Sequence, residues 1–199
     1  MSLSIVLLII GIAYILIWGL MSLLRREGLS MRFALESLAI TLVFSLLAAL
    51  TGFQLHPIVF LLLLYLFTMR ARLLVDVANM FAQRRQYQRA DTLYSLAKRL
   101  WPDPSSKLII LLNQGVSFLQ RGEVDQAIAA LKSLLQEAEG GYLGVKYEAA
   151  AHYNLGQAYR RKDMGAEAVR ELNECIDVWP GSLYARRAQD AIELWRNKA

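Results

Sequence analysis

Residues 155–180 read LGQAYRRKDMGAEAVRELNECIDVWP, and their spacing decides the fold of this chain. Gly156 is followed by Ala168, Leu172 and Cys175, and the segment closes on Trp179–Pro180. The same spacing occurs earlier, at Ala78, Ala90, Tyr94, Ala97, Trp101 and Pro102, and its first part occurs at Gly115, Ala127, Leu131 and Leu134. A chain that repeats one helix-pair unit three times is a stacked helical repeat protein, and such stacks form binding surfaces more often than active sites.

Each unit combines a small residue with an aromatic residue three positions later, namely Phe81, Phe118 and Tyr159. Antiparallel helices approach closely only where the facing side chains are small, and the aromatic ring fills the space beside them. This pattern resembles the tetratricopeptide repeat family most clearly at Leu155–Gly156, Tyr159 and Ala168. The resemblance implies an all-α solenoid of three repeats, at 71–104, 108–141 and 149–182, closed by a capping helix at 183–198.

The resemblance further implies a concave groove, lined by the first helix of each repeat, that binds a protein partner. The candidate groove residues are Asn79, Ile109, Leu112, Asn113, Val116, Tyr153, Asn154, Gln157 and Arg160. Ile109, Leu112 and Val116 are expected to form an apolar floor, and the amides of Asn113 and Asn154 to bond a peptide backbone. Family members that grip a terminal carboxylate carry basic residues where this chain has Val75, Ala150 and Asn154, so such a tail is not expected as the ligand. Alternatively, the cap helix or the membrane segment fills part of the groove.

The first 69 residues are strongly apolar. Residues 3–24 contain no charged side chain, 33–53 contain only Glu36, and a third run of thirteen residues follows at 57–69. About 20 apolar residues cross a bilayer as a helix. We therefore predict a transmembrane anchor over 1–69, with spans at about 3–24, 33–53 and 55–74, ahead of a cytoplasmic repeat domain over 70–199. The third run is short, and a re-entrant hairpin is the alternative to a full span.

Arginine placement predicts the orientation of the anchor, because loops rich in Lys and Arg stay in the cytoplasm. Arg25, Arg26 and Arg32 flank the first connection, whereas residues 51–56 contain no Lys or Arg. The chain is expected in a cytoplasmic membrane, of the bacterial type, with its N-terminus outside and its repeats inside. Of the net charge of +5, residues 70–102 contribute all five units. Arg70, Arg72, Arg84, Arg85 and Arg89 are therefore expected to face lipid headgroups, or else to be plainly solvated, and nucleic acid is not expected as a partner.

Ser37, Thr41, Ser45 and Ala49 recur every fourth residue and form a small, weakly polar face on the second span. In lipid, such faces pack against another helix, either within this chain or on a partner protein.

Residues suited to catalysis are scarce. His56 and His152 are far apart, and Cys175 occupies a helix-packing position of the third unit. No metal, cofactor, small-molecule substrate or enzymatic activity is expected. The leading interpretation is a membrane-anchored scaffold that recruits a protein partner or assembles it at the membrane. The alternative is an accessory subunit that contacts a transporter or energy-converting complex through its spans.

Overall fold

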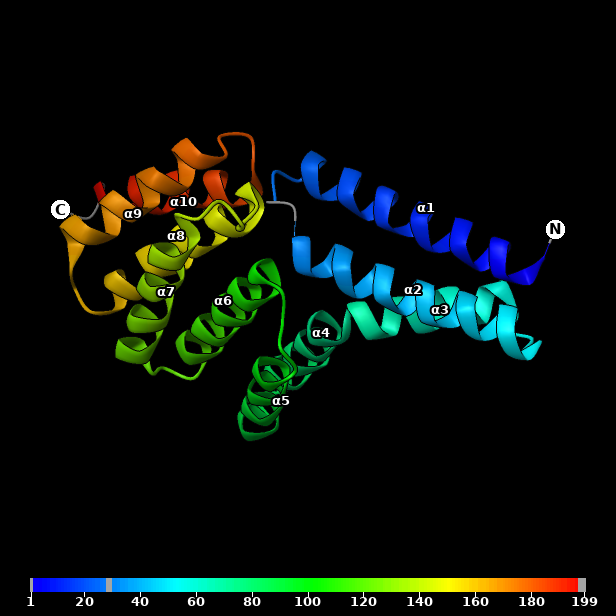
Figure 1. Cartoon of the computed structure of the whole chain (residues 1–199). Coiled ribbons are helices and arrows are strands. Elements are labelled where there is room, and N and C mark those ends of the chain that lie inside the picture. The colour runs from blue at the N-terminus through cyan, green and yellow to red at the C-terminus, as the bar shows by residue number, and fades with distance from the viewer. Residues whose placement is uncertain (1, 28–29, 197–199) are drawn as a thin grey trace.

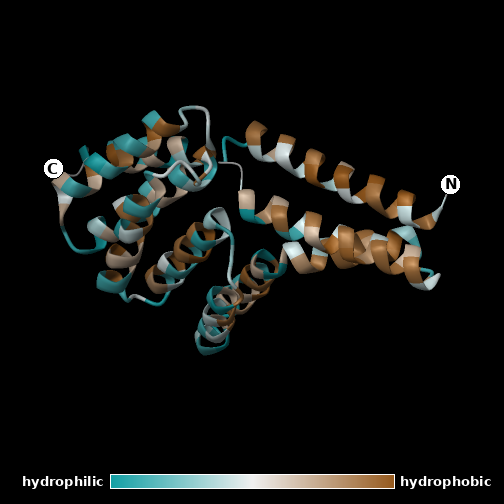
Figure 2. Ribbon diagram, viewed as in Figure 1, coloured by the Kyte–Doolittle hydropathy of each residue, from teal (hydrophilic) through white to brown (hydrophobic). Residues whose placement is uncertain are grey.

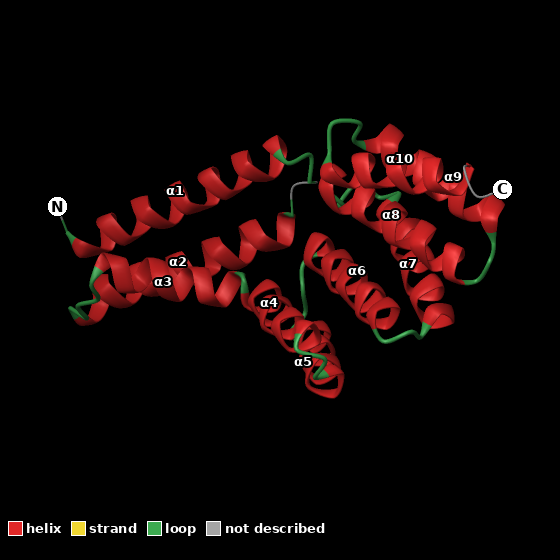
Figure 3. Ribbon diagram, turned by 180° about the vertical axis from the view of Figure 1, so that it is seen from behind, coloured by secondary structure: helices red, strands yellow, loops and turns green. Residues whose placement is uncertain are grey.

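The structure is a computed structural model, and it describes residues 2–27 and 30–196. Within these residues every regular element is a helix, so the predicted all-α fold is confirmed (Figures 1 and 3). The ten helices are α1 (Leu3–Leu24), α2 (Met31–Thr51), α3 (Pro57–Thr68), α4 (Arg70–Gln83), α5 (Tyr87–Arg99), α6 (Pro104–Gln120), α7 (Val124–Ala138), α8 (Val145–Arg161), α9 (Gly165–Val178) and α10 (Leu183–Arg196).

The helices α1 and α2 form an antiparallel hairpin, and both are long and apolar enough to cross a membrane. Their most apolar windows are only 11% and 22% buried, so most of this apolar surface faces outward (Figure 2). Exposed apolar surface of this extent is unfavourable in water and favourable in lipid. Ser30 caps the start of α2 by accepting a hydrogen bond from the Phe33 amide, and Gly52 ends α2 in the left-handed conformation.

The third apolar helix, α3, packs beside α1 and α2 but is much shorter. Pro57 begins it, and its last residue, Thr68, bonds the Tyr14 hydroxyl of α1 at 2.7 Å. At 1.5 Å per residue, twelve residues span about 18 Å, which is less than a hydrocarbon core of about 30 Å. The sequence predicted a helix continuing to about residue 74. Instead the chain bends by 72° between α3 and α4, at Met69.

The remaining helices form antiparallel pairs, α4–α5, α6–α7 and α8–α9, followed by α10, which packs on α8 and α9. The small residues of the repeat pattern lie where the paired helices touch. A Cβ on Gly115 would lie 2.8 Å from Leu131 Cγ, and one on Gly156 would lie 2.9 Å from Leu172 Cγ. In the first pair the equivalent Ala78 is fully buried against Ala90 and Tyr94. The spacing in the sequence thus reports helix contacts in the fold.

The first helices of the three pairs, α4, α6 and α8, lie side by side, and each begins at the edge of the solenoid that faces the anchor (Figure 1). The α6 helix begins at Pro104, four residues before the expected start of the second repeat, because Asp103 caps it by accepting a hydrogen bond from the Ser106 amide. This arrangement brings three helix N-termini next to the loop between α1 and α2.

Candidate functional site

The anchor and the repeats meet around one buried carboxylate, that of Glu27 in the loop between α1 and α2. Glu27 is 5% exposed, and its Oε2 lies 3.2 Å from Arg72 Nη2 of α4. Arg72 also donates hydrogen bonds to the hydroxyls of Ser105 and Ser106 in the first turn of α6. Helix N-termini carry partial positive charge, so an anionic side chain is favoured among them. Through Arg72, Glu27 therefore connects the anchor to the first two repeats.

The third repeat reaches the same loop through Gly144, the residue that precedes α8. A Cβ at Gly144 would lie 2.8 Å from Glu27 Cγ and 3.0 Å from the Arg25 carbonyl oxygen. Only a residue without a side chain allows this close approach. The connection between α7 and α8 thus packs directly on the loop between α1 and α2.

A second joint lies at the bend between α3 and α4. Arg70 forms a bidentate pair with Glu36 of α2, with nitrogen–oxygen distances of 2.8 and 3.1 Å. Its guanidinium also donates to the carbonyl oxygens of Leu100 and Trp101, while Arg32 donates to that of Pro102. Bidentate arginine–carboxylate pairs are among the strongest and most directional polar contacts. These bonds turn the chain at Met69 and place the end of the first repeat beside α2.

The five arginines expected to face lipid headgroups therefore lie in two environments. The guanidiniums of Arg70 and Arg72 bond Glu36 and Glu27 of the same chain and are partly buried. Arg84, Arg85 and Arg89 are exposed around the turn between α4 and α5. Trp101, whose carbonyl is held by Arg70, has its side chain exposed, with 75% of the residue accessible.

The small face of α2 packs within the chain. Ser37, Thr41 and Ser45 are buried, whereas Ala49 is exposed. Thr41 faces Gly11 of α1 so closely that a Cβ on Gly11 would lie 2.1 Å from Thr41 Oγ1. Of the two partners considered for this face, the structure places a helix of the same chain against it.

The candidate groove residues divide by burial. Ile109 and Leu112 are only 6% and 5% exposed and belong to the cores of the repeats, where they pack with residues such as Tyr94 and Leu131. Val116 is half-buried against the same core. The expected apolar floor is thus largely interior, because these side chains point between the helices.

The polar groove candidates remain more accessible. Asn113 and Asn154 are half-buried, and each amide nitrogen donates to the carbonyl oxygen four residues earlier in its own helix, at 2.7 Å. Gln157 is half-buried and Arg160 is exposed. Asn79, by contrast, already accepts a hydrogen bond from the Tyr94 hydroxyl.

The cap helix reaches the groove at one point. Tyr153 packs its ring against Tyr184 of α10, with centroids 5.7 Å apart. The cap thus covers part of the groove beside the third repeat, in keeping with the alternative in which the chain's own cap occupies it.

Two titratable side chains of the third repeat, Cys175 and Glu171, are buried. Burial raises the pKa of the Cys175 thiol to about 11. Burial alone would raise the pKa of Glu171, but hydrogen bonds from His152 and Arg170 outweigh it and lower that pKa. Among the described residues, no cluster of three or more His, Cys, Asp or Glu side chains is arranged to hold a metal ion.

Sequence reasoning missed Glu27, the residue on which the anchor–repeat contact centres. A single glutamate in a short loop, directly after Arg25 and Arg26, carries no signal of burial, because its neighbours Arg72 and Gly144 come from distant parts of the sequence. Trp101 was noted only as part of the repeat pattern, and its exposure could not be read from that pattern.

The helix pairs, their small-residue contacts and their stacking define a helical-repeat solenoid. The tetratricopeptide repeat family matches residues 110–138 and 150–182, which are the second and third helix pairs. Residues 110–138 and 150–182 therefore form tetratricopeptide repeats, and they follow apolar N-terminal helices. A comparison with curated proteins found no match.

Proposed function

We propose that this protein is a membrane-anchored scaffold that binds a protein partner on the concave face of its repeats and holds it at the cytoplasmic face of a membrane. Tetratricopeptide repeats are in general a protein-binding fold, and the two long apolar helices provide the means of membrane attachment. The observation that carries the proposal is the buried contact of Glu27 with Arg72 and Gly144. Because of it, the first helices of all three repeats are fixed relative to the anchor.

The membrane anchor in this proposal comprises residues 1–69 and the repeat domain residues 70–199. The 72° bend directs α4 nearly parallel to the membrane surface when α3 lies along the membrane normal. The exposed Arg84, Arg85 and Arg89 then lie near the headgroups, where each basic residue contributes about 1 kcal/mol of attraction to anionic lipid. Trp101 lies at the same boundary, the depth that tryptophan prefers.

The proposed orientation of the chain in the membrane, with the repeats in the cytoplasm, follows from three arginines. Arg25, Arg26 and Arg32 lie at the end of the α1–α2 hairpin next to the repeats. Thiol labelling of intact cells tests it, with single cysteines at Arg84 and Thr51 in a Cys175→Ala background. A membrane-impermeant maleimide is expected to label the Thr51 position and to leave the Arg84 position unlabelled until the cells are opened. The reverse pattern contradicts the proposed orientation.

Partner binding is tested by gentle detergent solubilisation and capture of the full chain. We choose Asn113→Ala, Asn154→Ala and Gln157→Ala together, because these accessible amides line the first helices. The matched control changes three exposed polar residues of the second helices, Gln126, Gln136 and Asn173, to Ala. The groove variant is expected to lose the co-purifying protein and the control to keep it; equal recovery from both variants contradicts the groove assignment.

The alternative of an accessory subunit that binds through its spans relied on the small face of α2. Because Ser37, Thr41 and Ser45 are buried against the chain's own helices, that face no longer favours an outside partner. Removal of residues 1–69 still separates the two functions: a scaffold keeps its partner in solution, and a span-bound subunit loses it.

A further inference from the structure

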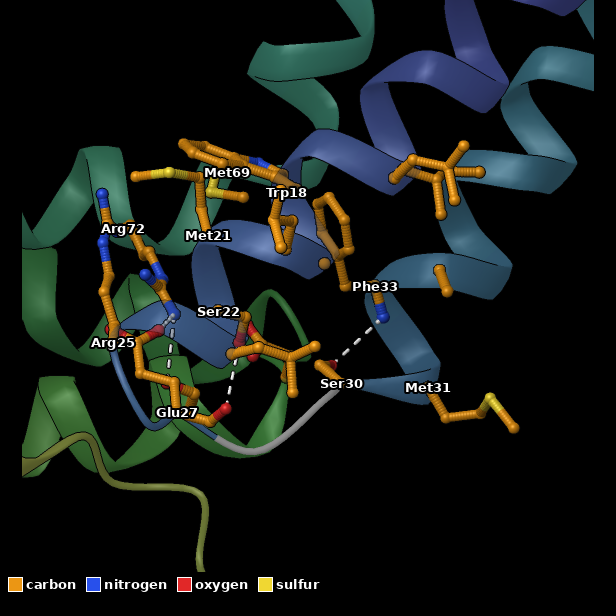
Figure 4. Close-up of a pocket in the computed structure, with 18 residues that line it drawn as sticks. Trp18, Met21, Ser22, Arg25, Glu27, Ser30, Met31, Phe33, Met69 and Arg72 are labelled. Atoms are coloured by element: carbon orange, nitrogen blue, oxygen red, sulfur yellow. Dashed lines mark hydrogen bonds and ion pairs between the residues drawn. The ribbon is translucent and has the colours of Figure 1, made fainter.

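A cavity of about 600 Å³ lies between the anchor and the first two repeats (Figure 4). Its walls are the second half of α1, the first turn of α2, and the beginnings of α4 and α6. Ligand-binding sites in proteins typically measure roughly 300–1,000 Å³. The cavity is thus large enough for a substantial part of a small amphiphile.

The cavity exists because α3 ends early. Thr68 bonds Tyr14, and α1 continues beyond Tyr14 for about three further helical turns. In the first of those turns the Trp18 ring still lies 6.5 Å from that of Tyr65 of α3. Further along, α1 has α2 beside it, and the chain has bent away from it at Met69. Leu16, Leu20 and Leu23 line the resulting space and are all more than half exposed. The cavity therefore opens sideways, toward the acyl chains of the cytoplasmic leaflet in the proposed placement.

The lining is polar at one end and apolar at the other. Figure 4 shows Arg25, Glu27 and Arg72 gathered on one side, and Trp18 and Phe33 on the other. The apolar part lies between the two spans and the polar part lies against the repeats, which is the order of acyl chain and headgroup across a leaflet. Filling an open apolar cavity with water is unfavourable in free energy, whereas filling it with an acyl chain is favourable.

The charged side chains that line the cavity indicate which kind of headgroup it can bind. Glu27 is paired with Arg72, and Asp103 caps α6, so these three groups are already satisfied within the protein. Arg25 forms no ion pair with any residue that the structure describes, and its guanidinium carbon lies 6.0 Å from the centre of the Trp18 ring. An unpaired guanidinium at the cytoplasmic end of a span is suited to a phosphate group.

We infer that this cavity binds one phospholipid of the cytoplasmic leaflet, with an acyl chain between α1 and α2 and its phosphate on Arg25. The lipid occupies the place that a full-length third span would fill, and so supports the repeats where they join the membrane. This inference rests on the proposed membrane placement of α1 and α2.

The test is native mass spectrometry of the full chain in detergent, with phosphatidylglycerol, phosphatidylethanolamine or a diacylglycerol of the same acyl chains added. Wild type is expected to retain one molecule of either phospholipid and little diacylglycerol. Ala34→Trp fills the cavity from α2 and is expected to reduce phospholipid retention at least tenfold. Ala39→Trp is its matched control, because Ala39 is exposed on the same helix and does not line the cavity.

The phosphate contact is tested by Arg25→Gln, which is expected to reduce retention several-fold, against Arg26→Gln, which removes the same charge from the neighbouring exposed residue. Circular dichroism confirms that each variant is folded. The inference is overturned if wild type retains no phospholipid, if diacylglycerol binds equally well, if Ala34→Trp matches Ala39→Trp, or if the two arginine variants behave alike.

Alkaline carbonate extraction of membranes separates this inference from the proposed function. Release of the wild-type chain by carbonate contradicts the membrane placement itself. A chain that stays in the membrane and captures its partner, but retains no phospholipid, contradicts the lipid site alone.

Discussion

Gly144, at the end of the α7–α8 connection, lies directly against Glu27, so that a side chain at this position would collide with Glu27. A Cβ at Gly144 would lie 2.8 Å from Glu27 Cγ. Residues that are 117 positions apart in the sequence thus fix the third repeat to the anchor.

Gly144→Val is expected to separate the third repeat from the anchor, because the added methyl groups must displace Glu27 or the backbone of Arg25. Limited proteolysis in detergent measures this as faster cleavage in the α1–α2 loop. Gly181→Val is the matched control, since a Cβ there meets no atom within 4 Å. Equal cleavage of wild type and Gly144→Val contradicts the close contact.

The buried pair of Glu27 and Arg72 is expected to give strong coupling in a double-mutant cycle. Removing one partner leaves the other charge buried and costs about 3–5 kcal/mol, whereas removing both costs much less than the sum. Glu27→Gln, Arg72→Gln and the double variant are compared by chemical unfolding in detergent.

The exposed pair of Lys162 and Asp125 is the control for that cycle, with side chains 41% and 81% exposed. Such pairs contribute about 0–1 kcal/mol, so Asp125→Asn is expected to change stability little. Additive effects at Glu27 and Arg72 would show that the two side chains act independently.

Gly156→Ala is expected to destabilise the repeats by about 1–3 kcal/mol, because the new Cβ would lie 2.9 Å from Leu172 Cγ and 3.2 Å from the Ala168 carbonyl oxygen. Gly165→Ala, at the start of α9, meets only Trp195 at 3.9 Å. This control is expected to be neutral or slightly stabilising, since glycine disfavours helix. Thermal unfolding followed by circular dichroism distinguishes the two, and similar melting temperatures contradict the packing described.

The sequence predicted the repeats well because their signal is local: Gly156, Ala168 and Leu172 report contacts within one helix pair. It also predicted the two long apolar helices, whose composition alone defines them. The bend at Met69 could not be predicted, because the contacts beside it involve Glu36 and the adjacent Leu100 and Trp101, which come from two other parts of the chain.

The groove residues were predicted less well than the repeats. Ile109 and Leu112 were expected to face a partner, yet they lie in the cores of the repeats. Neighbouring positions on a helix differ by about 100° in direction, so a one-residue uncertainty in register exchanges the core face for the groove face. Only the structure therefore shows which of the groove residues are buried.

Stability at acid pH is expected to depend on Glu171. Its folded-state pKa is lowered, so its contribution is present above the unfolded value near 4.5 and is lost as the pH falls through the lower folded value. Wild type should lose stability steeply below about pH 4.5, and Glu171→Gln should show a shallower loss over the same range. Identical pH profiles from unfolding experiments contradict this assignment.

Cys175 is expected to react slowly with thiol reagents in the folded protein. Burial raises its pKa to about 11, so the reactive thiolate is scarce at pH 8 and the sulfur is inaccessible. Alkylation followed by mass spectrometry should be much faster in denaturant than in detergent alone. Equal rates would show that α9 does not pack on α8 and α10 as described.

The central claim is that the anchor and the repeats form one rigid unit at the membrane. Pulsed electron paramagnetic resonance between spin labels at Arg26 and Glu139, in a Cys175→Ala background reconstituted in lipid nanodiscs, measures it most directly. Both positions are exposed, one in the anchor loop and the other after α7. We predict one narrow distance distribution that broadens in Gly144→Val; a broad distribution in the parent protein would contradict the claim.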